Sequence, residues 1–471
     1  MTTGSAYPTY RESGLPWAPR LPDGWQVLRN GRLFAHRVQT GFPDLPILEV
    51  SLRTGVRVRD MENLKRKQVM SQREKYKRAA QGDIAYNMMR MWQGALGPAP
   101  VDGLVSPAYV VVKPFPDANS AFYSYLFRTD AYMREVHKFS RGIVADRNRL
   151  YWDEFKQMPS LVPPRTEQDK IVAYLRAQDA HIARLIKAKR ELISLLTEQK
   201  LRIIDHAVTR GLDASVALKP SGIEWLGDVP HHWEIALVKH VTDVRFSGVD
   251  KHSHDHEMPV RLCNYTDVYK NDVITDNMDF MRATATAGEI ARLTLKAGDV
   301  IITKDSETPD DIAVPAWVPE GLPGVVCAYH LGLLRPEPGL IEGEFLFRAI
   351  GSARIAEQFH VLATGVTRFA LSKHDVKNAV IPLPPVTEQR IICKWIADQC
   401  KPLDDAIHRA EDEIKLIHEF RDRQIADVVT GQVNVRGWVP GPGDMVADED
   451  LALLGGDDDL DTEEEEGNGD D

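Results

Sequence analysis

Apolar residues recur at helical spacing in two long stretches of the chain. Over residues 166–209 they are separated mostly by three or four and by seven positions, and residues 387–430 repeat the pattern. This spacing is typical of an amphipathic helix and is close to that of a coiled-coil seam. The matched positions predicted to pair the helices and to dock partner subunits are Ile171, Leu175, Ile182, Ile186, Ile193, Leu196, Ile392, Ile396, Leu403, Ile407, Ile414 and Ile417.

The two stretches belong to a tandem repeat with a period of 221 residues. Pro163-Pro164-Arg165-Thr166-Glu167-Gln168 returns without a gap as Pro384-Pro385-Val386-Thr387-Glu388-Gln389. Val208-Thr209 likewise returns as Val429-Thr430, and a shorter echo, Pro22-Asp23-Gly24-Trp25 against Pro230-His231-His232-Trp233, opens each half. We therefore expect a duplicated unit that ends in a long helix.

Local signals predict how the two helices begin and end. The first should start at Thr166 as N-cap, because two prolines precede it, and should stop before Gly211. The second contains Pro402, which removes a backbone hydrogen bond, so we expect a break there. Each long helix needs a partner for its apolar stripe, and we expect Ile182 to face Leu403.

The segments between the helices predict two mixed α/β domains with a similar fold and divergent surfaces. Gly82-Asp83 and Gly298-Asp299 each precede a short apolar run, which indicates a turn that enters a strand. Further strands are expected at 108–112 and 325–329, and helices at 121–135 and 344–358.

Charge is distributed unevenly along the chain. Residues 444–471 hold fourteen Asp or Glu and no Lys or Arg, so the net charge of −11 becomes +3 for residues 1–443. Such a block is usually a solvated, disordered tail, although it could also compete with nucleic acid for basic surface. No signal segment and no apolar run long enough to span a membrane are evident, so we expect a cytoplasmic protein.

Positive charge is concentrated between Arg53 and Arg78, where ten basic residues stand against three acidic ones. This density favours a phosphate-binding surface, and a solvated helix face is the alternative. The candidate DNA-binding residues are Arg53, Arg57, Arg59, Lys65, Arg66, Lys67, Arg73, Lys75, Lys77, Arg78, Arg147, Arg245, Lys251, Lys304 and Arg368.

Motifs for catalysis are missing from the sequence. We find no Asn- or Asp-Pro-Pro-Tyr/Phe motif of a DNA amino-methyltransferase and no Gly-rich phosphate loop. His252, His254 and His256 alternate and could in principle hold a metal, but an exposed polar loop explains them better. We therefore expect no catalytic residue, no metal and no cofactor in this chain.

Two divergent domains, each followed by the same Pro-Pro-x-Thr-Glu-Gln helix and a closing Val-Thr, resemble the specificity subunit of type I restriction-modification enzymes. The resemblance covers residues 18–436 and implies an α+β fold: two α/β target-recognition domains separated by two long antiparallel coiled-coil helices, in a pseudo-twofold internal repeat. The implied domains are an N-terminal extension (1–17), target-recognition domain 1 (18–160), helical spacer 1 (161–222), target-recognition domain 2 (223–380), helical spacer 2 (381–436) and an acidic disordered tail (437–471).

The resemblance also implies the function and the partners. Each domain would read one half of a split, asymmetric sequence in double-stranded DNA, and the helices would fix the spacing of the halves. Two modification subunits would use S-adenosylmethionine to methylate adenine, while restriction and translocase subunits would use ATP and Mg. Two other hypotheses stay open, namely the recognition subunit of a methylation-only or other phage-defence complex, and a coiled-coil scaffold that does not bind DNA.

Overall fold

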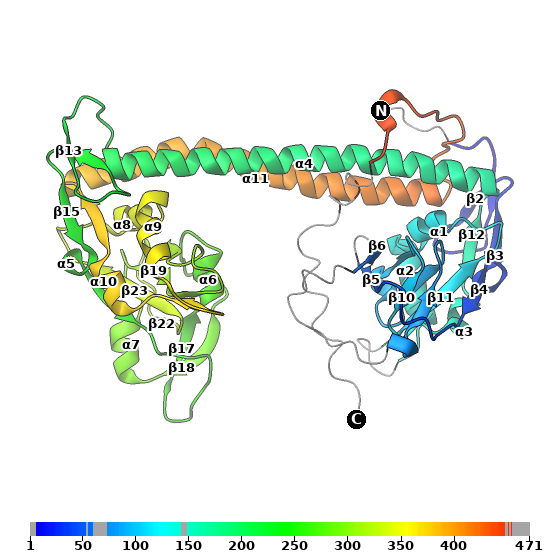
Figure 1. Cartoon of the computed structure of the whole chain (residues 1–471), viewed down its shortest axis with the longest axis horizontal. Helices are drawn as coiled ribbons and strands as arrows, with labels where there is room; N and C mark the ends of the chain where they lie inside the picture. Colours follow the sequence, from blue (N-terminus) through cyan, green and yellow to red (C-terminus); the bar gives the residue numbers. More distant parts are fainter. Residues whose placement is uncertain are drawn as a thin grey trace. The chain divides into compact units, whose positions relative to one another are not determined.

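The computed structural model describes residues 6–52, 55–59, 73–142 and 148–447, together with Leu451 and Leu454. Unit 1 comprises Met1–Glu191 and Ala410–Asp471, and unit 2 comprises Leu192–Arg409. Both boundaries fall inside the long helices α4 (Arg165–Arg210) and α11 (Val386–Val429). Each unit therefore contains one globular domain, one part of α4 and one part of α11 (Figure 1).

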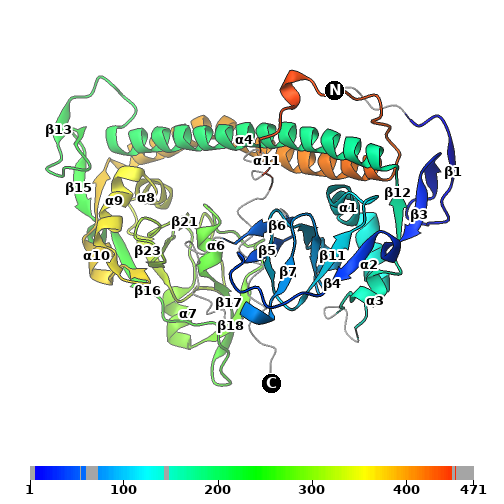
Figure 2. The same cartoon turned by 45° about the vertical axis from the view of Figure 1, so that its right-hand side comes forward.

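The domain of unit 1 is built on a four-stranded antiparallel sheet in the order β4-β11-β8-β9. These strands are β4 (Phe34–Arg37), β11 (Tyr109–Pro114), β8 (Ile84–Asn87) and β9 (Leu96–Pro98). All of β8 and the first four residues of β11 are buried, which explains their continuous apolar runs. The helices of this domain are α1 (Ser120–Phe127), α2 (Asp130–Phe139) and α3 (Trp152–Phe155), and α1 packs beside the first turns of α4 (Figure 2).

Four further strand pairs lie in the described part of unit 1. They are β1 (Tyr10–Glu12) with β2 (Arg20–Pro22), β3 (Gln26–Arg29) with β12 (Pro159–Val162), β5 (Leu48–Ser51) with β6 (Gly55–Val58), and β7 (Lys77–Ala79) with β10 (Gly103–Val105).

Unit 2 repeats the same sheet order with different residues. Its central sheet is β16-β23-β19-β21, formed by β16 (Thr242–Phe246), β23 (Leu331–Pro336), β19 (Val300–Thr303) and β21 (Pro315–Trp317). The expected likeness of the two domains is thus confirmed in the order of their strands.

The other strands of unit 2 are β17 (Met258–Cys263), β18 (Met281–Ala285), β22 (Val325–Cys327), β20 (Asp305–Ser306), β24 (Thr364–Gly365), β25 (Phe369–Ala370), β13 (Leu218–Pro220), β14 (Asp228–Pro230), β15 (Glu234–Leu237) and β26 (Val380–Leu383). Its helices are α5 (Val238–Val241), α6 (Tyr265–Tyr269), α7 (Ala287–Leu293), α8 (Gly343–Ile350), α9 (Ala353–Leu362) and α10 (Lys373–Asn378).

The single helices predicted at 121–135 and 344–358 are each two helices. Thr129 interrupts the first because its side chain accepts a hydrogen bond from the Tyr132 amide and caps α2. Ser352 interrupts the second in the same way, by accepting from the Ile355 amide and capping α9. Both are preferred N-cap residue types, and both have the extended backbone that is typical of an N-cap.

The repeated Pro-Pro-x-Thr-Glu-Gln element clamps each domain to its long helix. The buried Gln168 side chain donates to the carbonyls of Asp117 and Pro163 at 3.0 and 2.8 Å, and accepts from the Asn119 amide at 2.9 Å. Gln389 makes the same three hydrogen bonds in unit 2, at 2.8–3.0 Å. The repeated sequence motif therefore has a structural role, because it fixes each domain to the start of its long helix.

The predicted ends of the first helix are partly wrong. Helix α4 begins at Arg165, and the Pro164 carbonyl accepts from the amides of Glu167 and Gln168, so Thr166 lies inside the helix instead of capping it. The predicted stop at Gly211 is confirmed by its φ of 73°, which suits glycine, and by the bond from its amide to Ala207.

The predicted break at Pro402 is wrong. Helix α11 runs without interruption from Val386 to Val429 with Pro402 inside it. Pro402 and Asp398, whose carbonyl loses its partner, are both exposed, so water can satisfy this carbonyl. Packing of the buried face, which includes Ile396 and Cys400, keeps the helix continuous.

The repeat begins earlier than the sequence comparison indicated. Ser13-Gly14-Leu15-Pro16-Trp17 and Ser221-Gly222-Ile223-Glu224-Trp225 form the same turn, in which the glycines have φ of 77° and 80°. In each turn the serine hydroxyl accepts from the amide two residues later. These segments are offset by 208 residues, as are Pro22–Trp25 and Pro230–Trp233, so the repeat extends upstream of that echo.

Both outer segments of the described chain meet within unit 1. The Tyr7 hydroxyl donates to Glu167 at 2.7 Å, and the Arg436 guanidinium binds the same carboxylate at 2.8 Å. Gly431, just beyond α11, lies against Pro22 and Trp25, so closely that a Cβ there would come within 2.5 Å of the proline. The domain of unit 1 is thus assembled from residues at both ends of the chain.

Residues 437–447, which the sequence places in the acidic tail, are described and lie along α4 within unit 1. Trp438 packs edge-on against Tyr174, and Asp444 binds His181 at 2.7 Å. Arg184 also donates to the Gly443 carbonyl at 3.0 Å. The rest of the tail, apart from Leu451 and Leu454, lies outside the described residues.

Candidate nucleic-acid interface

Each domain contains a turn closed by a buried carboxylate. Gly82 and Gly298 have φ of 84° and 87°, and the aspartates that follow them, Asp83 and Asp299, are 2% and 0% exposed. Each carboxylate accepts from the amide three residues before it, at 2.9 and 2.7 Å. The Gly-Asp pairs noted in the sequence therefore fix the entry to β8 and β19.

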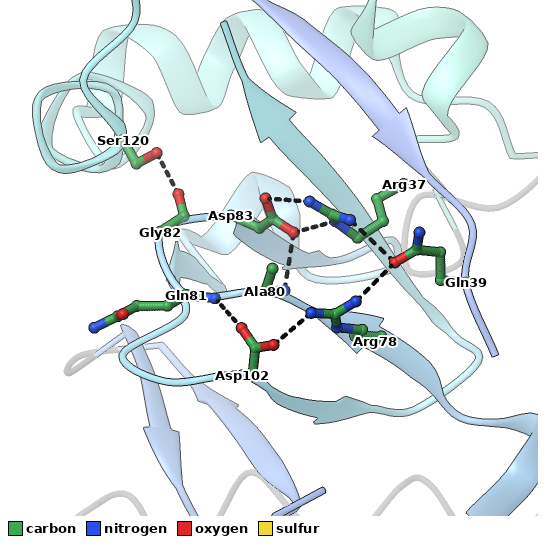
Figure 3. Close-up of polar contacts among 9 residues, drawn as sticks. All are labelled: Arg37, Gln39, Arg78, Ala80, Gln81, Gly82, Asp83, Asp102 and Ser120. Carbon is green, nitrogen blue, oxygen red and sulfur yellow. Dashed lines mark hydrogen bonds and ion pairs between the residues drawn. The ribbon is translucent and has the colours of Figure 1, made fainter. Parts of the chain in front are cut away.

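The arginine that neutralises this carboxylate comes from a different strand in each domain. In unit 1 it is Arg37 of β4, which binds Asp83 through two nitrogens (Figure 3). In unit 2 it is Arg335 of β23, which binds Asp299 at 2.7 and 2.8 Å. The scaffold is conserved between the repeats while the side chains around it have changed.

Arg78, a predicted DNA-binding residue, belongs to the same network in unit 1. Figure 3 shows Gln39 between the two guanidiniums, accepting from Arg37 at 3.0 Å and from Arg78 at 3.5 Å. Arg78 also binds Asp102 at 2.5 Å, and this hydrogen bond, together with that from the Gln81 amide, lowers the pKa of Asp102. The charge of Arg78 is thus largely balanced within the domain.

Most of the described basic cluster also has partners inside the domain. Arg57 and Arg59 both approach Glu49, at 2.5 and 3.8 Å. Arg73 donates to the Leu45 carbonyl at 2.8 Å, and Lys77 donates to the carbonyls of Pro107 and Tyr109, both at 2.7 Å. Lys75 is exposed. Arg53, Lys65, Arg66, Lys67 and Arg147 lie outside the described residues.

Unit 2 brings two of the predicted residues, Lys304 and Arg368, to one place. The Lys304 ammonium lies 5.4 Å from the Phe246 ring and 4.7 Å from the Tyr329 ring, as in cation–π contacts. Arg368 is exposed and lies 3.5 Å from Nδ1 of His330. The other two candidates are not gathered here, because Arg245 binds Asp243 and Lys251 is exposed in a separate loop.

The same place contains residues that the sequence did not single out. His330 has a φ of 73°, which is rare for a residue other than glycine, and its Nδ1 is hydrogen-bonded to Asp305. Tyr329 is 45% exposed and packs on His330 with ring centroids 4.0 Å apart. Nearby, Tyr265 stacks on Tyr269, and burial followed by the charge of Asp311 raises the pKa of Tyr265. The left-handed backbone of His330 is visible only in the structure, because no local sequence signal predicts this conformation.

The predicted seam residues are most buried where the helices meet the domains. Ile171 and Leu175 belong to the core of unit 1, and Ile392 and Ile396 belong to a core of unit 2. Ile182 and Ile186 are also buried, whereas Ile193, Leu196, Leu403, Ile407, Ile414 and Ile417 are only partly covered.

The helices pair in antiparallel fashion within each unit. In unit 1, Asp179 binds Arg421 at 2.6 Å and Lys189 binds Glu413, and in unit 2, Lys200 binds Asp404 at 2.8 Å. The expectation that Ile182 faces Leu403 is therefore wrong. Ile182 and Leu403 occupy equivalent positions of the two repeats, and antiparallel helices do not bring such positions together. Ile182 is three residues from Asp179 and therefore lies opposite the region around Arg421.

Asp179 joins three helices of unit 1. It is buried and accepts from the Tyr125 hydroxyl at 2.7 Å as well as from Arg421. Burial and the Asp179 charge raise the pKa of Tyr125 far above its usual value. This contact joins α1, α4 and α11 inside unit 1.

Neither a group of metal ligands nor a membrane-spanning helix is found in the described part of the chain. No group of three or more His, Cys, Asp or Glu side chains there is arranged to hold a metal ion, and His254 and His256 are exposed. Within the same residues no helix combines the length and the apolar composition needed to cross a bilayer.

Comparison with known proteins places these observations in context. No model of a known protein family matches the chain. The type I restriction enzyme MjaVIII specificity subunit of Methanocaldococcus jannaschii is 22% identical over 291 residues, which cover 60% of this chain and 64% of that protein. The putative type I restriction enzyme MjaX specificity subunit of the same organism is 21% identical over 311 residues, covering 64% and 66%. The chain thus aligns with slightly less than two thirds of the length of each relative.

A solved structure shows the same fold. A chain from a study of complex assembly and conformational transition of the type I R-M system superposes with a TM-score of 0.59 at 14% identity, covering 87% of this chain and 98% of that chain. The expected α+β fold with two paired long helices is therefore confirmed, as is the resemblance of the chain to type I specificity subunits.

Proposed function

We propose that this chain is the DNA-recognition subunit of a type I restriction-modification complex. It would bind double-stranded DNA, read a bipartite asymmetric target with one domain per half-site, and direct adenine methylation or cleavage by partner subunits. The observation that carries the proposal is the duplication of one sheet scaffold, with the same glutamine clamp but different surface residues. Two copies of one scaffold with different surfaces suit a target whose halves differ.

The long helices support the assembly with partners. Within each unit they bury apolar residues at one end, yet several large apolar side chains remain exposed on them. These are Leu185, Leu192, Leu195, Leu201, Ile391, Leu416 and Phe420, which are 43–63% exposed. Exposed apolar surface of this kind is typical of protein-binding surfaces. We assign it to two modification subunits, which would hold S-adenosylmethionine, while ATP and Mg would be bound by restriction and translocase subunits.

The proposal leaves no catalytic step to this chain. Arg37 and Arg78 are paired with carboxylates of their own domain and therefore support the fold, whereas the Lys304 ammonium lies beside two aromatic rings, which suits a contact with DNA. Phosphate contacts would supply affinity and groove contacts would supply specificity.

Methylome sequencing tests this function directly. Deleting the gene should abolish methylation at one split sequence, and restoring it on a plasmid should restore that methylation. A matched control restores the gene with Gln168→Leu and Gln389→Leu, which removes both clamps and should not restore the methylation. A methylome that does not respond to the deletion would contradict the proposal.

A further inference from the structure

Strand pairing identifies equivalent positions in the two domains at the ends of the central strands. In unit 1, Asn87 of β8 pairs with Tyr109 of β11, and in unit 2, Thr303 of β19 pairs with Leu331 of β23. The residue that follows β8 is Met88, so its equivalent after β19 is Lys304. The residue that precedes β11 is Ala108, and its equivalent before β23 is His330.

Main-chain hydrogen bonds support this equivalence. The Met88 amide donates to Ala108 at 3.4 Å, and the Lys304 amide donates to His330 at 3.0 Å. The Met88 carbonyl accepts from Leu150, and the Lys304 carbonyl accepts from Leu371, both at 2.9 Å. The backbone is thus the same at this place in the two domains.

The side chains at this place differ completely between the domains. Unit 1 has Met88-Met89 and Pro107-Ala108, whereas unit 2 has Lys304-Asp305 and Tyr329-His330. Apolar side chains in one domain are thus replaced by a cation, an anion, an aromatic ring and an imidazole in the other. In contrast, the Gly-Asp turns and the clamping glutamines are retained. A difference of this kind on a retained backbone is expected where two copies of a domain have acquired different targets.

The polar set of unit 2 is held in a defined orientation. Asp305 fixes His330 through Nδ1, and two aromatic rings flank the Lys304 ammonium. The left-handed backbone of His330 costs free energy, and such strain is retained mostly at functional sites. Groups that read base edges must be oriented in this way before they bind.

The hairpin beside Lys304 and His330 carries an arginine that is common to both repeats, unlike the side chains described above. Arg368 lies in the β24–β25 hairpin, and the sequence places Arg147 at the same position of the first repeat. Gly365 fixes the hairpin, since a Cβ there would lie 2.0 Å from the Arg368 carbonyl oxygen. A cation shared by domains with different targets suits a contact with the phosphate backbone.

We propose that Lys304 and His330 are the specificity-determining residues of the second domain, and that Arg368 anchors the DNA backbone beside them. Lys304 would donate to O6 and N7 of a guanine in the major groove, and His330, oriented by Asp305, would contact the neighbouring base pair. The assignment rests on the function proposed above, because it requires that this domain bind duplex DNA.

The test uses the full complex with its modification subunits and a duplex library randomised in both half-sites. Lys304→Met and His330→Asn should change the base preference in one half-site by roughly tenfold or more and leave the other half-site unchanged. Asparagine is chosen because it tolerates the left-handed backbone. Arg368→Ala should instead weaken binding to all sequences alike and reduce the salt slope by about one.

Arg282→Ala is the matched control, since Arg282 is an exposed cation on β18 of the same domain. Thermal unfolding of each variant distinguishes a loss of folding from a loss of base recognition. Uniform weakening by Lys304→Met and His330→Asn, or no more effect than Arg282→Ala, would overturn the assignment. A wild-type complex without preference for any split sequence would instead refute the function proposed for the whole chain.

Discussion

Single side chains explain why the most recognisable motif of the sequence is structural. Gln168 and Gln389 each bind three main-chain groups with one amide, and no other side chain of similar length offers both donors and an acceptor in this geometry. Asp83 plays a comparable part, because it closes a turn and neutralises Arg37 at the same time. These residues repeat because both domains need the same joint.

Replacing Asp83 with alanine should destabilise unit 1 by about 3 kcal/mol, the lower end of the range for breaking a buried ion pair. The loss arises because Arg37 and the Ala80 amide would lose their acceptor while remaining mostly buried. Chemical denaturation of the full chain, followed by tryptophan fluorescence, measures the change. Asp102→Ala removes the partly exposed carboxylate of the same network and should cost less. Equal losses would show that the burial of Asp83 is not the cause.

Unit 1 should also lose stability as the pH falls below neutrality. Burial, followed by the charge of Lys77, lowers the pKa of His36 below 6.5, and its ring stacks on Trp152. The unfolded chain therefore takes up the proton first, so this stabilisation is present above pH 6.5 and is lost as the pH falls through the lower pKa of the folded state. His36→Gln should flatten the dependence of the unfolding midpoint on pH in this window, and an unchanged pH profile would contradict the assignment.

Helices were predicted best where apolar residues keep a helical spacing over many turns. The seam from Ile171 to Leu196 and its repeat predicted α4 and α11, because periodicity over many turns outweighs single residues. The prediction failed at Pro402, where tertiary packing overrides a local breaker, and at Thr129, where a cap divides a helix. The site was harder to predict, because the partners of Arg78 and Lys77 lie on strands and loops distant in sequence.

Replacing Pro402 with alanine should stabilise unit 2 by about 1–3 kcal/mol, since an interior proline costs about 3 kcal/mol in a helix and some of this is offset in the unfolded chain. The substitution restores the amide that can bond to the Asp398 carbonyl. Urea denaturation of the full chain would measure the gain. Gln399→Ala, an exposed substitution in the same turn, should change the stability by only a few tenths of a kcal/mol. A loss of stability in Pro402→Ala would mean that the proline supports the helix.

At the scale of the whole molecule, the chain consists of two domains with one scaffold and two surfaces. Both domains use the same sheet order, clamp and Gly-Asp turn, while the ends of β8 and β19 carry unrelated side chains. The acidic tail was predicted to begin at residue 437, but residues up to 447 are held along α4. The acidic composition of the segment does not predict these contacts, because they depend on the positions of single residues, His181 with Asp444 and Arg184 with the Gly443 carbonyl.

Exchanging residues 18–160 for the matching domain of a related specificity subunit should change only one half of the methylated sequence. The expectation follows because the exchanged segment ends before α4 begins at Arg165, so α4 with Gln168, α11 and the second domain keep their sequence. Methylome sequencing of the strain that carries the hybrid provides the measurement. The reciprocal exchange of residues 223–380 should change only the other half. A hybrid that assembles with its partners yet alters both halves would rule out one domain per half-site.

The core of unit 1 is formed by two parts of the chain that are far apart in sequence, and this has a consequence for folding during translation. Its core requires Ile425, Val428, Val429 and Val435, and Gly431 must meet Trp25, yet translation produces all of residues 192–409 before these residues. The second domain can therefore complete its core while the first, although translated earlier, still waits for its last helix and the segment that follows. Nascent unit 1 must remain incomplete, with part of its apolar surface uncovered, for as long as the ribosome needs to translate the whole of unit 2.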